Sequence, residues 1–117
     1  MGENFAQFIS AGSFDELLLE AIDEAFSTMG NSVREALYFC LEKEFKISRT
    51  SIPEKLEDFA RALEKIFGMG AKLIENWIIR ILNEKSIGSM QSNRNDGVLF
   101  AEYVTSLRRN YAQKISS

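Results

Sequence analysis

Apolar side chains recur every three or four residues along most of this chain, which is the spacing of amphipathic helices. The clearest stretch is 53–85, where two such patterns meet at Gly68-Met69-Gly70. Each helix would present one apolar face, so we expect the pair to form a hairpin around which the rest of the chain packs. The apolar positions of this stretch are Leu56, Phe59, Ala60, Leu63, Ile66, Phe67, Leu73, Ile74, Trp77, Ile78, Ile81 and Leu82.

Two more helices are expected before the hairpin, at about 14–29 and 33–45. Ser13 and Ser32 each stand three residues before a glutamate, a pattern typical of a capping box at the start of a helix. Gly30 is suited to end the first of these helices in a left-handed conformation. The second helix is apolar over much of its circumference, which favours a central position in the fold.

The helix ends carry further signals. The apolar side chains of 1–12 suffice only for a short arm, which Ala11-Gly12 is expected to separate from the first helix. Ser51 is expected to cap the third helix, with Pro53 in its first turn, where the missing N–H of proline is not needed. Residues 86–97 are rich in Ser, Asn and Gly and therefore predict a flexible linker.

Together these patterns predict an all-α fold built as a compact bundle of four core helices, at about 14–29, 33–45, 53–67 and 71–85, with a C-terminal helix at about 98–115. The expected organisation is a helical core domain with a short N-terminal arm (1–85), the flexible linker (86–97) and a C-terminal helical arm (98–117). We expect five large side chains to be mostly buried in the core: Phe26, Leu37, Phe59, Leu63 and Trp77.

Cysteine content and hydropathy indicate the cellular compartment. The one cysteine, Cys40, cannot form an internal disulfide, which is typical of a protein in the reducing cytoplasm. Its place in an apolar stripe favours a small core residue over a reactive thiol. No apolar run approaches the roughly 18 residues that span a bilayer, and no signal-peptide pattern opens the sequence. We therefore expect a cytoplasmic protein that does not associate with a membrane.

Charge is distributed unevenly along the chain. Residues 1–32 contain six acidic and no basic residues, whereas 86–117 contain four basic and two acidic ones. These two ends could attract each other within one chain or between two copies, but the simpler interpretation is a solvated face at each end. Because the last helix has one apolar face behind a long linker, we predict a homodimer to which that face contributes. Its residues are Phe100, Tyr103, Val104, Leu107, Tyr111 and Ile115.

The residues that usually carry catalysis or bind metals are mostly missing. The chain has no histidine, which removes the commonest general base and the commonest transition-metal ligand. With a single cysteine, a zinc or iron–sulfur site within one chain is excluded. Asp15, Glu16, Glu20, Asp23 and Glu24 could share a helix face, but carboxylate-bridged metal sites usually also need Glu-x-x-His. We therefore expect no catalytic residues, no metal, no cofactor and no enzymatic activity.

Nucleic-acid binding is the alternative. Basic residues gather around 43–61, where one helix, a turn and a second helix follow each other as in a helix-turn-helix. The expected contacts are Lys46, Arg49 and Lys55. Acidic residues are interleaved with them, and the whole chain carries a net charge of −3. Phosphate contacts supply most non-specific affinity, so this balance disfavours nucleic acid as the partner.

The amino-acid sequence of residues 14–85 resembles that of a small archaeal domain of unknown function. The resemblance rests on LLEAIDEA at 18–25, on ALYFCLEK at 36–43, on Ile52-Pro53 and on ALEKIFGMGAK at 62–72. That domain occurs alone and attached to archaeal signal-transduction proteins, where it is classed as a candidate output domain. Cys40 stands where we expect a histidine in some relatives, which argues against a chemical role at this position. The resemblance implies a non-enzymatic regulatory or protein-interaction module with an unidentified protein partner.

Overall fold

The structure, a computed structural model, describes residues 11–85 and 100–116. Its α-helices are α2 (Ala11–Thr28), α3 (Asn31–Phe45), α4 (Leu56–Phe67), α5 (Ala71–Lys85) and α6 (Phe100–Ser116). Two 3-10 turns lie between them, η1 (Arg49–Glu54) and η2 (Gly68–Gly70). No strand occurs in these ranges, so the prediction of an all-α bundle is confirmed. The predicted linker at 86–97 and nearly all of the predicted N-terminal arm lie outside the described residues.

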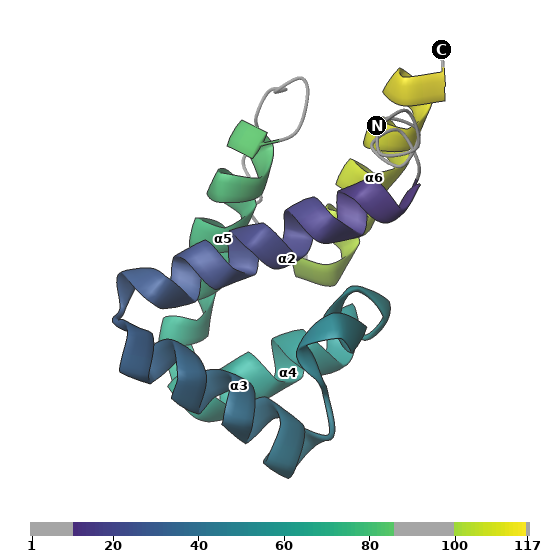
Figure 1. Cartoon of the computed structure of the whole chain (residues 1–117). Helices are drawn as coiled ribbons and strands as arrows, with labels where there is room; N and C mark the ends of the chain where they lie inside the picture. Colours follow the sequence, from purple (N-terminus) through teal and green to yellow (C-terminus); the bar gives the residue numbers. More distant parts are fainter. Residues whose placement is uncertain (1–10, 86–99, 117) are drawn as a thin grey trace, which may run out of the picture.

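α2 is the central helix of the bundle and crosses the middle of the molecule (Figure 1). It packs most extensively against α5, and also against α3, α6 and η1. Its buried side chains include Phe14, Leu18, Ile22 and Phe26, which follow the three-and-four spacing of one helix face. The prediction that the second helix, α3, is central was wrong, because only Leu37 and Leu41 of that helix are buried.

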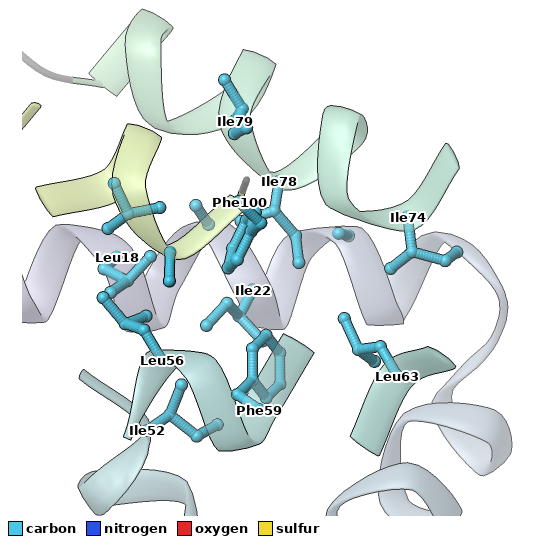
Figure 2. Packing of buried hydrophobic residues seen from close by; sticks show 14 of the residues in the cluster. Leu18, Ile22, Ile52, Leu56, Phe59, Leu63, Ile74, Ile78, Ile79 and Phe100 are labelled. Atoms are coloured by element: carbon cyan, nitrogen blue, oxygen red, sulfur yellow. The ribbon is translucent and has the colours of Figure 1, made fainter. Parts of the chain in front are cut away.

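Aromatic rings connect the helices inside the core. Phe59 of α4 lies with its ring centroid 6.4 Å from that of Phe26 and 6.1 Å from that of Phe100. Phe26 in turn lies 5.3 Å from Tyr38 of α3. Figure 2 shows Ile22, Phe59 and Phe100 gathered in the interior, each from a different helix. These tilted ring pairs join α2, α3, α4 and α6 into one hydrophobic cluster.

Four of the five expected core residues are buried, namely Phe26, Leu37, Phe59 and Leu63. The fifth, Trp77, is only partly buried at the edge of the cluster. The centre of the buried face of α5 lies toward Ile74, Ile78 and Leu82, and Trp77 is on its flank.

Three details of the helix starts differ from the predictions. Ala11-Gly12 does not stand before the first helix but is helical and belongs to α2. α3 begins at Asn31 and no side chain caps it, so Ser32 lies in the first turn and is not a capping residue. Gly30 does follow the end of α2 with a positive φ of 112°, but its ψ of 147° is not that of the predicted left-handed conformation.

The third difference lies before α4. Pro53 does not open the α-helix but belongs to η1, and α4 starts at Leu56. The Ser51 hydroxyl donates to the Ser48 carbonyl at 2.9 Å and does not cap α4. The tighter turn is favoured because it buries Ile52 and Pro53 in the core.

Candidate functional site

The described residues offer no candidate metal site. In 11–85 and 100–116, no group of three or more His, Cys, Asp or Glu residues could hold a metal ion. Cys40 is a free thiol of intermediate exposure on α3. No helix in this part of the chain is long and apolar enough to cross a membrane. Candidate sites must therefore be sought in polar clusters and in surfaces.

One polar cluster joins α2 to α3. Asp23 accepts a hydrogen bond from the Tyr38 hydroxyl at 3.1 Å and an ion-paired one from Arg34 at 3.3 Å. The Arg49 guanidinium lies over the Tyr38 ring, 5.9 Å from its centroid. Burial raises the pKa of Tyr38 to about 12; the nearby Arg49 opposes this shift and Asp23 adds to it. The phenol is therefore neutral at physiological pH and acts as a hydrogen-bond donor.

A second cluster anchors α6 on the rest of the fold. Arg108 lies 2.7 Å from the Asp15 carboxylate and also donates to the Pro53 carbonyl at 3.3 Å. Its guanidinium stands 5.4 Å from the centre of the Phe14 ring. One side chain of α6 thus contacts both the start of α2 and η1. This is the within-chain form of the attraction predicted between the acidic start and the basic end.

An open groove of about 710 Å³ runs between this anchor and the first turn of α4. The α4 side carries Glu57 and Asp58, preceded by Glu54 of η1, whereas Arg108 and Arg109 line the α6 side. Because the groove is wide open and charged along both sides, it lacks the apolar lining typical of a small-molecule pocket.

The predicted nucleic-acid contacts lie around η1. Lys55 donates to the backbone carbonyl of Lys46 at 3.3 Å, which brings these two residues together. Arg49 is exposed, and its guanidinium lies over the ring of Tyr38. The exposed positions of α4 include Glu57, Asp58 and Glu64 as well as two basic residues. A recognition helix of this composition would set carboxylates against phosphates.

The predicted interface of the C-terminal helix lies largely inside the chain's own core. Phe100 and Val104 are buried, and Tyr103 and Leu107 are partly buried against the same cluster. The side chains of Tyr111 and Ile115 lie outside the described ones. If two copies exchanged α6, each would make these same contacts with the core of the other copy. The homodimer through this helix stays a prediction.

Several large apolar side chains stand at the surface, among them Leu73, which belongs to a predicted apolar face. Leu73 of α5 is 72 % exposed and Phe39 of α3 is 65 % exposed. Met69, which the sequence placed in the α4–α5 turn, is 94 % exposed. The signal that could have shown this is the width of the stripes: α3 and α5 have apolar side chains over more of their circumference than one neighbour can cover.

A half-buried carboxyl group lies next to the exposed residues of the α4–α5 turn. Burial raises the pKa of Glu75 above its ordinary value, and the nearby negative charge of Glu64 raises it further. Lys72 acts in the opposite direction. The two carboxyl groups thus repel each other when both are charged.

Comparison of the chain with models of known protein families, with curated proteins and with solved structures gives no significant match.

Proposed function

We propose that this chain is a non-enzymatic regulatory or protein-interaction module that binds a protein partner through the α4–α5 turn. The observation that carries the proposal is the exposure of Met69 and Leu73 there. Trp77 follows one turn later on the same side of α5 and is partly buried. Single exposed apolar residues are common on protein surfaces, but two large ones one turn apart, with a partly exposed third beside them, are typical of an interaction site.

The regulatory part of the proposal comes from the resemblance of 14–85 to a candidate output domain of archaeal signalling proteins. An output domain needs a surface that a partner can recognise, and it needs no catalytic group of its own. The cytoplasmic location inferred from the single Cys40 belongs to the same proposal.

The experiment is capture of partner proteins on the immobilised chain from a lysate of the source organism. The test variant carries Met69→Ser and Leu73→Ser, and the control carries Lys72→Ser at a neighbouring exposed position. We expect the control to retain the captured protein and the test variant to lose most of it, because interface apolar residues contribute far more than peripheral charges. Equal capture by both variants would show that the partner binds elsewhere.

Nucleic-acid binding is the second candidate, favoured by the contact between Lys55 and the Lys46 carbonyl. Such binding would depend on phosphate contacts and would therefore be strongest at low salt. A gel shift with duplex DNA that weakens with salt and disappears on Arg49→Glu would support it. No shift even at low salt would rule it out in favour of a protein partner.

A further inference from the structure

Met69 is the most exposed of the large apolar side chains in the described part of the chain, at 94 %. It stands between Gly68 and Gly70 in η2, a turn in which no residue is buried. A Cβ atom placed on Gly68 would meet nothing within 4 Å, so the space on that side of the turn is open. Solvent therefore reaches the thioether of Met69 from nearly all sides.

An exposed thioether has a chemistry that no aliphatic side chain shares, since a mild oxidant converts it into a polar group. With hydrogen peroxide, the sulfur lone pair forms an S–O bond while the O–O bond breaks. The proton of the transferred oxygen passes to the leaving hydroxide, which departs as water. The sulfur loses two electrons and the peroxide gains them. This step requires no catalytic residue, so access to the sulfur decides how fast a methionine reacts.

Met29 is the other methionine of the described residues, and its surroundings are different. It follows the end of α2 and is partly buried against the hydrophobic cluster. A sulfoxide there would place a polar oxygen against the core, which is unfavourable. A sulfoxide at Met69 would stand in water, because η2 buries nothing. Oxidation at Met69 is therefore both faster and compatible with the folded structure.

We propose that Met69 is a site of reversible oxidation, at which a peroxide makes the surface of the α4–α5 turn polar without disturbing the fold. Leu73 shares this surface, is 72 % exposed and does not react with peroxide. A sulfoxide reductase restores the thioether, with two thiols oxidised to a disulfide and the oxygen released as water. The effect on a partner rests on the proposed function, because a partner that covers Met69 would have to bury the sulfoxide oxygen.

The open surroundings also predict the stereochemistry of the product. Addition of oxygen makes the sulfur a chiral centre, and each of two types of reductase acts on one epimer. At 94 % exposure, neither face of the sulfur is shielded by the fold. We therefore expect both epimers in similar amounts, so that full recovery of the thioether requires both reductases.

The experiment treats the full chain with hydrogen peroxide and follows each methionine by peptide mass spectrometry. Met69 should react several-fold faster than Met29, and as fast as the same residue in the free peptide IFGMGAK of 66–72. The chain oxidised at Met69 should keep its circular dichroism spectrum and its midpoint of thermal unfolding. It should elute earlier from a phenyl resin under native conditions, because the resin binds exposed apolar surface. Treatment with both reductases should restore the original retention.

Met69→Leu is the matched control, since leucine has a similar volume and no sulfur. This variant keeps every other methionine, so any effect of their oxidation remains in it. Its retention should not change on the same treatment. Capture of protein from the lysate should fall by roughly tenfold when the parent chain is oxidised, and should not fall for treated Met69→Leu.

Three results would overturn the proposal. The first is a Met69 that reacts no faster than Met29, and the second is a loss of structure in the chain oxidised at Met69. The third is a change of retention that is equal in the parent and in Met69→Leu. If the variant with Met69→Ser and Leu73→Ser loses capture and the oxidised parent does not, oxidation does not regulate this surface.

A failure of the proposed function gives a different result. The variant with Met69→Ser and Leu73→Ser would then capture as much protein as the parent. The rate of oxidation and the shift in retention involve no partner, so they decide whether Met69 is the oxidation site in either case.

Discussion

At the scale of single residues, Asp23 shows how one carboxylate can connect three segments of the chain. Its carboxylate accepts hydrogen bonds from Tyr38 and Arg34 of α3, and the guanidinium of Arg49 of η1 lies over the Tyr38 ring. Arg34 Nε is buried without a hydrogen-bond partner in the described part of the chain, so the cluster is not fully satisfied. The hydrogen bonds that Asp23 accepts are partly buried, and hydrogen bonds in such surroundings are stronger than at the open surface.

The first prediction concerns Tyr38→Phe. Because the folded-state pKa of Tyr38 is about 12 against 10.0 for the free side chain, the unfolded chain loses this proton first as the pH rises. The folded state then holds more protons between about pH 10 and 12, so this contribution to stability is complete below pH 10 and is lost through that interval. Tyr38→Phe should remove this part of the alkaline slope and cost about 0.5–1.5 kcal/mol at neutral pH through the lost hydrogen bond to Asp23.

Urea unfolding at several pH values from 7 to 12 measures both effects. The parent chain is the comparison, since the two proteins differ only in the Tyr38 hydroxyl. An unchanged alkaline slope would show that Tyr38 does not keep its proton in the folded state.

At the scale of elements, the end of α3 determines how the chain turns toward η1. Lys46 adopts the left-handed conformation, with φ 59° and ψ 36°, which is favourable for glycine and costly for other residues. This conformation lets the Ile47 N–H reach the Leu41 carbonyl at 2.9 Å. The reversal carries Ile47 into the core, where it is 1 % exposed. The burial of Ile47 offsets the cost of the unusual backbone.

The second prediction compares Lys46→Gly with Lys46→Ala. Both variants lose the same charge and differ in the Cβ atom, which clashes in the left-handed region. We expect the glycine variant to be about 0.5–1 kcal/mol more stable, after the greater freedom of glycine in the unfolded chain is subtracted. Urea denaturation of the two proteins side by side measures the difference. An alanine variant of equal or greater stability would contradict the left-handed geometry.

At the scale of the whole molecule, the structure joins the C-terminal helix to the same core as the other helices. Phe100, Ala101 and Val104 belong to the cluster formed by α2, α4 and α5. The Arg108–Asp15 ion pair connects residues 93 positions apart in the chain. A helix held in this way contributes to global stability, whereas a loosely tethered arm would not.

The third prediction follows from this joining. Phe100→Ala should destabilise the protein by about 3–5 kcal/mol, because it removes a buried ring that packs against Phe59. The control is Arg109→Ala on the exposed side of the same helix, expected within about 0.5 kcal/mol of the parent. Thermal unfolding measures both and should show one cooperative transition. If the two variants were equally stable, α6 would not be part of the core.

The sequence by itself determined the helices and most of their turns. The three-and-four spacing of apolar residues depends only on the geometry of the helix, and it located α2 to α6 to within a few residues. Glycines at Gly30 and Gly68 adopt positive φ where the sequence predicted turns. These features are local, so neighbouring residues along the chain are sufficient to specify them.

The tertiary structure alone decided which apolar residues are covered. α3 and α5 both carry apolar stripes wider than one neighbouring helix can bury, and periodicity does not show which edge remains outside. The packing left Phe39 and Leu73 exposed, placed Trp77 at the margin and made α2 the central helix instead of α3. The candidate surfaces arise from this choice. Packing depends on contacts between residues far apart in the chain, such as Arg108 with Asp15, which no local pattern encodes.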